Sequence, residues 1–301
     1  MSHAPVTVQV PASTSNCGAG FDTLGLALSI YNRVTLAPAS GVRPVAERAS
    51  DTLALEMVAE TANAFFTACG RGPVGFSYRI EGDVPPARGL GSSITVIAGV
   101  LAGLDRMLDA GLSRHRLVEI ATAIEGHPDN ASAGILGGFC VSRCEPASGK
   151  YVDTVRFELP EMLKFVVASP AVELLTKASR GVLPSTLPFF DAVKSINSAT
   201  YLVAAIASGN YDKLRGSVSD FMHEPYRLPG IRGAAEAIAA GVEAGALTGW
   251  LSGSGSSVLC VARAQSAAAV ATAMRGAFTT AGIDSVARVL MADNTGLKVL
   301  G

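Results

Sequence analysis

A glycine-rich loop that leads directly into a long apolar segment constrains the fold most strongly. The loop reads PPARGLGSS over 85–93, and the segment SSITVIAGVLAGLDRMLDA over 92–110 is nearly all apolar. Such a segment predicts a buried helix, and Gly111 is expected to end it. Gly89 and Gly91 permit positive φ and close approach of the backbone. Exposed N–H groups at the start of a helix attract an anion such as a phosphate, so the sequence predicts a phosphate loop here.

This loop is also consistent with a simpler interpretation, and it differs from the well-known nucleotide loops. A glycine- and serine-rich stretch before a helix is also consistent with an N-cap that binds nothing. Neither standard nucleotide fingerprint is present: GAGFDT at 18–23 lacks the third glycine of a dinucleotide loop, and the chain has no GxxxxGK[ST]. A phosphate loop in this chain is therefore expected to be of a different type, without the lysine.

Two further clusters of small polar residues lie near the two ends of the chain. SGSGSS occupies 252–257, and PASTSNCGAGFD at 11–22 follows the alternating run VTVQV at 6–10. Taken alone, the segment 11–22 is typical of a turn that closes a strand. Its hydroxyls, amide and acid also suit contact with a ligand, and the residues alone leave both interpretations open.

Elsewhere, the pattern of apolar residues predicts an α+β chain. Strands are expected at 6–10, 31–38, 75–85, 164–170, 247–253 and 258–264, and helices at 53–69, 114–125, 190–208, 232–244 and 265–281. Ser113 suits the N-cap of the helix at 114–125, and Gly126 suits its end. A chain of 301 residues can form two cores, and the pattern restarts near 163. We expect two lobes, 1–160 and 161–301.

Composition argues against several classes of protein. The net charge is −1 and only 16% of residues are charged, so neither a nucleic-acid nor a membrane partner is expected. The longest uncharged stretches, such as 244–262, are broken by glycine and serine and read poorly as membrane spans. The first residues lack a secretory pattern. Five cysteines without a CxxC suit reduced thiols, and the four histidines lack a zinc spacing. We expect a soluble cytoplasmic protein.

Five motifs in order along the chain resemble the GHMP kinases, named after galactokinase, homoserine kinase, mevalonate kinase and phosphomevalonate kinase. Three of the motifs, at 11–28, 85–93 and 252–257, are similar to those of the superfamily as a whole. EGHPDNASAGILGGF at 125–139 and HEPYRLPG at 223–230 resemble the homoserine kinases within it. The resemblance covers most of the chain. It implies a βαβ-rich N-terminal nucleotide-binding lobe with a left-handed crossover, a ferredoxin-like C-terminal lobe, and an active site between them.

The resemblance implies that the central loop holds the triphosphate of ATP. The implied nucleotide contacts are Arg88, Gly89, Leu90, Gly91, Ser92 and Ser93. The hydroxyl of Ser93, or that of Ser92, would also bind Mg²⁺. Glu125 is expected to be the partner carboxylate, because it lies at the flank of the buried face of its helix while Glu119 points roughly opposite. Without the family, either glutamate is equally consistent with a solvated surface charge.

The opening motif, by the same resemblance, faces an amino-acid substrate rather than the nucleotide. The implied substrate contacts are Asn16, Asp22, His127, Asn130, Thr176, Arg180, Arg227 and Gly253. Asp22 suits an ammonium or hydroxyl group, and Arg180 and Arg227 suit a bidentate grip on a carboxylate. Without the family, Asn16 would be a left-handed turn residue, His127 a packing residue, and each arginine a surface charge.

The sequence departs from the family pattern in a few places. Ile94 stands where alanine usually follows the loop, no adenine-binding residue is recognisable around 50–56, and two residues are missing between Arg227 and Pro229. A general base is also missing, as in other homoserine kinases, because Asp129 is offset from the aspartate that mevalonate kinases use. Asn130 and Asp22 are therefore the expected catalytic residues, which hold the acceptor hydroxyl.

The resemblance implies an ATP- and Mg²⁺-dependent kinase that converts L-homoserine to O-phospho-L-homoserine, in threonine biosynthesis. One alternative is a GHMP kinase for another small hydroxylated carboxylate, and a second is a non-catalytic metabolite sensor on the same fold. Ser93 and Glu125 favour catalysis, and the two arginines favour an amino-acid-like carboxylate. The partner is expected to be a small amino acid, and the family commonly forms homodimers.

Overall fold

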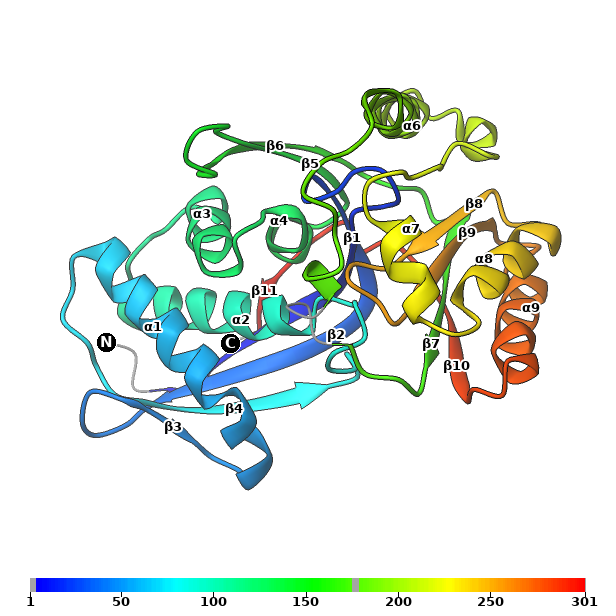
Figure 1. Ribbon diagram of the computed structural model, residues 1–301. Coiled ribbons are helices and arrows are strands. Elements are labelled where there is room, and N and C mark those ends of the chain that lie inside the picture. Colours follow the sequence, from blue (N-terminus) through cyan, green and yellow to red (C-terminus); the bar gives the residue numbers. More distant parts are fainter. Residues whose placement is uncertain (1–3, 175–178, 301) are drawn as a thin grey trace.

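The structure is a computed structural model that describes residues 4–174 and 179–300. Two β-sheets stand side by side, each covered by its own helices (Figure 1). The larger sheet contains β1 (Val6–Ser15), β2 (Leu24–Pro38), β3 (Pro44–Ala46), β4 (Phe76–Gly82), β5 (Phe139–Cys144), β6 (Tyr151–Phe157) and β11 (Lys298–Val299). The smaller sheet contains β7 (Leu163–Pro170), β8 (Thr248–Leu251), β9 (Val258–Arg263) and β10 (Ser285–Leu290).

The long strand β2 organises the larger sheet. It pairs with β1 along one edge, while its other edge pairs with β5 near Leu24–Leu26 and with β4 over Asn32–Pro38. All pairings are antiparallel except that of β3 with β4. β1 pairs with β2 along its whole length, from Val6 to Ser15. Its C-terminal end contacts the second sheet, where Trp250 Nε1 of β8 donates a hydrogen bond to Thr14 Oγ1.

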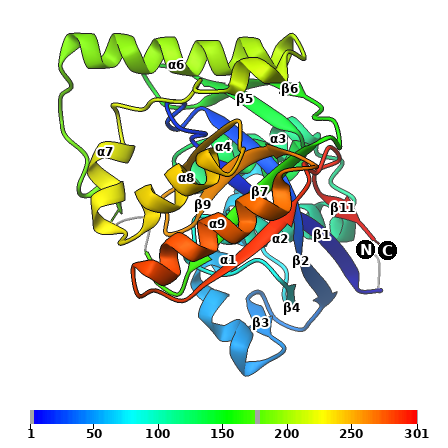
Figure 2. The ribbon, with the colours of Figure 1, turned by 90° about the vertical axis from the view of Figure 1, so that its right-hand side faces the viewer.

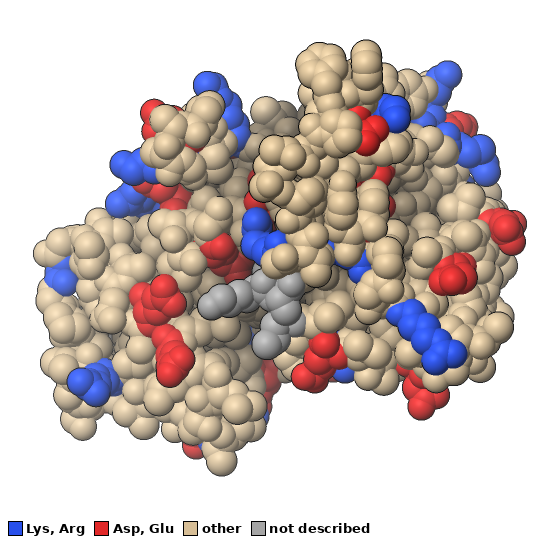
Figure 3. Space-filling view, viewed as in Figure 1, with Lys and Arg blue, Asp and Glu red and all other residues tan. Residues whose placement is uncertain are grey.

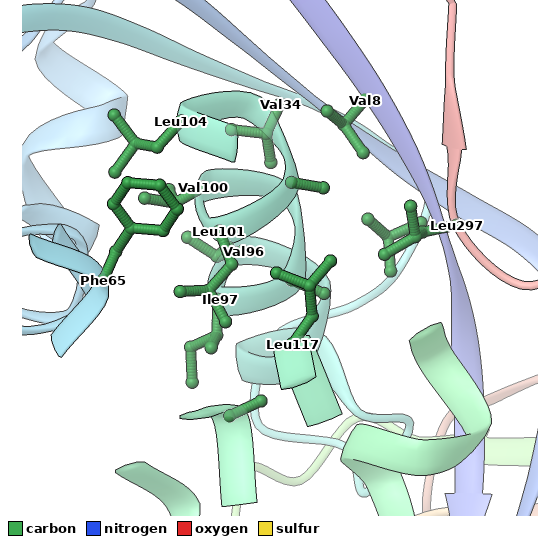
Figure 4. Close-up of a cluster of buried hydrophobic side chains, with 14 of the residues drawn as sticks. Val8, Val34, Phe65, Val96, Ile97, Val100, Leu101, Leu104, Leu117 and Leu297 are labelled. Carbon is green, nitrogen blue, oxygen red and sulfur yellow. The ribbon is translucent and has the colours of Figure 1, made fainter. Parts of the chain in front are cut away.

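Four α-helices lie over the larger sheet: α1 (Leu55–Cys69), α2 (Ser92–Leu108), α3 (Arg114–Glu125) and α4 (Asp129–Leu136). The predicted buried helix is α2, whose side chains meet those of β1, β2 and α1 in the first core (Figure 4). A Cβ on Gly99 or Gly103 would lie 2.5 Å from Val34 or 2.6 Å from Leu36, respectively. These glycines therefore let α2 pack directly against β2.

The smaller sheet has the order β10-β7-β9-β8 with every pair antiparallel. One of its faces is covered by α8 (Ala234–Glu243) and α9 (Ala267–Thr280), which lie next to each other (Figure 2). The other face meets β2 and β5 and the helix α6 (Phe189–Ala207) in a core that both sheets share. This arrangement and the connecting helices match the predicted ferredoxin-like lobe.

The remaining elements within residues 4–174 and 179–300 are short helices: η1 (Ala49–Ala54), η2 (Tyr211–Leu214), α7 (Glu224–Arg227) and η3 (Leu228–Gly230). Most predicted elements are present, with helices α1, α3, α6, α8 and α9 within a few residues of their expected bounds. Some local details differ from the expectation. Residues 11–15, for which a turn was one of two open interpretations, continue β1. The strand expected from 31 already begins at Leu24, and α2 ends at Leu108, two residues before its expected end, where Asp109 adopts φ 50°.

The end of the chain returns to the first lobe. β11 pairs with β1, and Leu297 beside it packs in the core of the first sheet. The side chain of Asp293 accepts a hydrogen bond from the Tyr31 hydroxyl at 2.9 Å. The two sheets fall on either side of residue 160 except for this returning segment. The domain division itself stays a prediction.

Charged side chains of both signs are interspersed over the face shown in Figure 3, in keeping with the net charge of −1. Within the described part of the chain, no helix combines the length and the apolar character needed to cross a membrane.

Candidate active site

A cavity of about 500 Å³ lies where the start of α2 faces the second lobe. Most of the predicted site residues line it: Asn16, Asp22, Arg88, Gly89, Gly91, Ser92, Ser93, Glu125, His127, Asn130, Arg180, Arg227 and Gly253. Leu90 does not, because its side chain is buried in the core shared by the two sheets. Thr176 lies outside the described residues. The structure thus brings together residues that are up to 237 positions apart, such as Asn16 and Gly253.

The glycine-rich loop requires its glycines for both conformation and space. Gly89 and Gly91 have φ values of 69° and 65°, and Gly91 is the N-cap of α2. A Cβ on Gly89 would lie 2.1 Å from the Ser252 carbonyl oxygen, and one on Gly91 would lie 2.1 Å from the Ser13 hydroxyl. No described side chain caps the helix, so its first N–H groups can bind an anion.

The predicted metal ligands Ser93 and Glu125 are in contact, although they come from α2 and α3. The Ser93 hydroxyl donates a hydrogen bond to Glu125 Oε1. Burial raises the pKa of Glu125, while the nearby His127 and the hydrogen bond from Ser93 oppose the shift. Glu119 points away, as expected, and pairs with Arg116 at 2.5 Å on the exposed side of α3. The two oxygen atoms of Ser93 and Glu125 are the hard ligands that Mg²⁺ prefers.

The amide of Asn130 is held at both ends by hydroxyls of β1. Ser13 Oγ donates to Asn130 Oδ1 at 2.8 Å, and Asn130 Nδ2 donates to Ser15 Oγ at 3.1 Å. The backbone N–H of Asn130 donates to the carboxylate of Asp129 at 2.7 Å. Part of the small polar chemistry of the opening motif therefore serves to orient a side chain from a different motif.

Asp129 is almost fully buried, and its carboxylate contacts two neighbouring groups. Besides the Asn130 N–H, its Oδ1 contacts His127 Nδ1 at 2.6 Å. Burial disfavours the charged imidazole, but the hydrogen bond and the charge of Asp129 outweigh it and raise the pKa of His127 to about 9. Asp22 also lies close, so that atoms of Asp22, His127 and Asp129 fall within 4.8 Å of one another. This geometry gives Asp129 the role of a partner to His127.

The turn after β1 places Asn16 and Asp22 in left-handed conformations, with φ of 67° and 52°. Asn16 Oδ1 accepts from the Asp22 N–H at 3.0 Å, and its Nδ2 donates to the Gly253 carbonyl at 3.0 Å. Asn16 therefore joins the opening motif to the third glycine cluster. A Cβ on Gly253 would lie 3.2 Å from both Gly89 O and Ser15 Oγ, so the three motifs pack against each other.

Two arginines from the second lobe complete the cavity. Arg180 Nη2 pairs with Asp22 Oδ1 at 2.6 Å, with both side chains about one-third exposed. Arg227 is buried, and its Nε donates to the Ser179 carbonyl at 3.1 Å. Burial lowers the pKa of Arg227, and the charge of Arg180 adds to this effect. Two like charges facing one cavity form a site for an anionic group.

Sequence reasoning missed several residues of the cavity. Phe21 lies 5.3 Å from Arg180 Cζ and 5.2 Å from Arg227 Cζ, measured to the ring centroid. Leu53, Ala54 and Met57 also line the cavity, in or next to the stretch 50–56 where no adenine-binding residue was recognised. The position of Phe21 directly before Asp22 was a signal that the sequence offered. Leu53, Ala54 and Met57 gave no such signal, because isolated apolar residues are usual on a helix surface.

The sequence matches known families and relatives over most of its length. Residues 55–138 match the GHMP kinases N terminal domain, and residues 202–280 match the GHMP kinases C terminal domain. A homoserine kinase from Moorella thermoacetica is 38% identical over 301 residues, which cover 97% of this chain and 99% of that protein. The chain belongs to the homoserine kinases, within the GHMP kinases.

Other members of the family agree with this assignment. A homoserine kinase from a Synechococcus strain is 37% identical over 299 residues, which cover 97% of this chain and 94% of that protein. The crystal structure of homoserine kinase from Cytophaga hutchinsonii superposes with a TM-score of 0.89 at 26% identity, covering 100% of this chain and 99% of that one. The predicted family, two-lobed α+β fold and kinase activity are confirmed.

Proposed function

We propose that this cavity transfers the γ-phosphoryl group of ATP to the side-chain hydroxyl of L-homoserine, which yields O-phospho-L-homoserine on the way to threonine. The family supports the reaction. The observation that carries the assignment to this site is the shared cavity, in which the uncapped start of α2 faces Arg180 and Arg227. An anionic nucleotide and an anionic substrate can therefore bind side by side.

The first half of the cavity suits the triphosphate. The backbone of the loop 88–93 and the dipole of α2 supply donors, and Arg88 adds a guanidinium. Arg88 Nη1 is buried and hydrogen-bonds to none of the described residues, which fits a donor that a phosphate oxygen would satisfy. Ser93 and Glu125 would hold Mg²⁺, which when bound neutralises charge on the transferring phosphate.

The second half suits an amino acid with both of its charges. Asp22 offers a carboxylate to the ammonium group, and Arg180 and Arg227 offer two guanidinium groups to the carboxylate. In the described structure Asp22 and Arg180 pair with each other, so a zwitterion would satisfy both by exchanging partners. Thr176, Gly253 and Asn16 stay predicted contacts of the same substrate.

The acceptor hydroxyl is held by Asn130 and Asp22 in this proposal, without a dedicated base. Asp129 accepts from Asn130 N–H and contacts His127, so its oxygen Oδ1 is already engaged. Phosphoryl transfer through a loose transition state needs little activation of the nucleophile, and alignment contributes more. His127 stays a predicted contact beside that hydroxyl. The expected homodimer and cytoplasmic location also stay predictions.

A panel of matched substrates tests the proposal by the release of ADP in the presence of Mg²⁺. Homoserine carries both charges, 3-aminopropan-1-ol lacks the carboxylate, and 4-hydroxybutyrate lacks the ammonium group. Homoserine should give the highest kcat/KM, and each analogue should lose at least one charge-assisted contact worth about 1.5–3 kcal/mol. Faster turnover of 4-hydroxybutyrate would favour the alternative kinase, and no turnover of any compound would favour the sensor.

A further inference from the structure

Phe21 lies at the centre of the cationic part of the cavity, although nothing in its own chemistry binds a carboxylate. Its ring centroid is 5.3 Å from Arg180 Cζ and 5.2 Å from Arg227 Cζ. The ring of His223 is a third neighbour, with its centroid 5.3 Å away and tilted by 36°. One aromatic side chain thus contacts both arginines that face the substrate.

The turn that carries Phe21 is closed by backbone hydrogen bonds and belongs to the first lobe. The Gly20 N–H donates to the Asn16 carbonyl at 2.9 Å, and the Gly20 carbonyl accepts from Thr23 and Leu24 at 3.0 and 2.9 Å. A Cβ on Gly20 would lie 2.2 Å from the side chain of Leu24, so the turn packs closely against the start of β2. Phe21 therefore comes from the first lobe, whereas both arginines come from the second.

The arginines come from two separate segments of the second lobe. Arg180 has one carboxylate partner, Asp22, whereas Arg227 contacts only carbonyl groups and the His223 ring nitrogen among its described hydrogen-bond partners. Two guanidinium groups that face one cavity repel each other, and the charge of Arg180 contributes to the lowered pKa of Arg227. The electron-rich face of an aromatic ring attracts a guanidinium within about 6 Å of its centroid.

We propose that Phe21 is a positioning residue for substrate recognition, whose ring holds the guanidinium groups of Arg180 and Arg227 in place for an incoming carboxylate. The inference rests on the proposed function, because the substrate carboxylate that the two arginines would hold is itself part of that proposal. Groups that are ordered before binding lose less freedom when the ligand arrives, so the ring strengthens homoserine binding without touching its reacting atoms. The ring also links the two lobes at the substrate.

The test replaces Phe21 with phenylalanines that carry one, two and three fluorine atoms on the ring. Fluorine withdraws electrons from the ring face but changes its shape little, so a purely structural role would not be affected. KM for homoserine should rise stepwise with each fluorine while KM for ATP and kcat stay unchanged. Phe21→Leu, which removes the ring, should raise KM for homoserine about five- to thirty-fold, and Phe21→Tyr should restore it.

Phe189→Leu is the matched control, because Phe189 is an exposed phenylalanine at the start of α6 that does not line the cavity. It should leave both KM values unchanged. Equal homoserine KM across the fluorinated series, or a parallel rise in KM for ATP, would overturn the inference. Arg227→Met separates it from the proposed function. If that variant also binds homoserine normally, the carboxylate site itself is wrong; if only the fluorinated series is silent, Phe21 alone was misassigned.

Discussion

The two halves of the cavity are built in different ways. The nucleotide half consists mainly of one continuous segment, the loop 88–93 with the start of α2, and it offers backbone N–H groups. The substrate half consists of side chains from distant segments, among them Asp22, Asn130, Arg180 and Arg227. A backbone site needs only glycines and a helix, whereas a side-chain site needs the fold to assemble it. The first should tolerate changes of side chain and the second should not.

We expect the largest loss of activity from Ser93 and Glu125, because in the nucleotide half these two residues contribute side chains rather than backbone N–H groups. Ser93→Ala and Glu125→Gln should each lower kcat by an amount equivalent to about 2–4 kcal/mol of transition-state stabilisation, with the fold intact. Steady-state kinetics at saturating Mg²⁺ and ATP would measure this. Glu119→Gln is the control on the same helix and should be silent. Wild-type turnover in both variants would show that neither residue binds the metal.

Removing the arginines tests the substrate half. Arg180→Met and Arg227→Met should each raise KM for homoserine far more than KM for ATP, because a charge-assisted hydrogen bond in a partly dry site contributes about 1.5–3 kcal/mol. The effect should be greater for Arg227, which is buried, than for Arg180, which is about one-third exposed. The analogue 3-aminopropan-1-ol should not distinguish the variants from the parent protein. Unchanged homoserine KM would instead favour the alternative substrate.

Asn130 and Asp129 test whether alignment or a base governs the transfer. Asn130→Ala should reduce kcat by an amount equivalent to about 1–3 kcal/mol, because the amide that Ser13 and Ser15 orient would be lost. Asp129→Asn should reduce kcat less, once rates are corrected for the fraction of folded protein. Circular dichroism would establish that fraction. A stronger loss in Asp129→Asn, with disappearance of the acidic limb of the pH–rate profile, would identify an aspartate base.

The smallest expected effect concerns Glu224, which contacts none of the proposed ligands but belongs to the short helix that carries Arg227. Glu224 starts the helix that carries Arg227 and accepts a hydrogen bond from the Leu251 N–H at 2.7 Å. Burial raises its pKa from 4.5 to about 8. Between these values the folded protein binds the proton more tightly than the unfolded chain does, so this group lowers the stability as pH rises.

The free energy of unfolding should therefore fall by about 1 kcal/mol between pH 6 and pH 7 through Glu224. Urea unfolding of the parent protein and of Glu224→Gln would measure it, since the amide keeps an acceptor for Leu251 but does not ionise. The variant should lose this part of the pH dependence. Identical slopes in the two proteins would show that Glu224 is ionised in the folded state.

Local signals along the chain were read correctly where a single residue type decides the geometry. Ser113 caps α3 by accepting from the Arg116 N–H at 3.2 Å, and Gly70 and Gly126 end their helices with positive φ. The family resemblance named a carboxylate as the partner of Ser93, and the helical wheel favoured Glu125 over Glu119, because periodicity fixes which face a residue occupies; the two side chains are in contact. These features depend on neighbours within a few residues.

Other features were misread because distant residues decide them. Residues 11–15 look like a turn by composition, yet they form the end of β1. Ser13 and Ser15 bond to Asn130, and Thr14 accepts from Trp250 Nε1 at 3.1 Å. Hydroxyls that find partners more than 100 positions away can be buried in a strand. β11 is too short to carry a pattern, and it exists only because β1 has a free edge there.

The sequence by itself determined the buried helix α2, the glycine-rich loop before it and the family to which the chain belongs. The helix and the loop follow from residues that are adjacent in the chain, where glycine conformation and apolar periodicity act locally. The family follows from the resemblance of five motifs in their order along the chain. Only the tertiary structure decided that the Phe21 ring lies near both Arg180 and Arg227 and that Asp129 contacts His127. Such contacts depend on how two lobes pack, and packing joins residues whose spacing in the sequence carries no information about their distance.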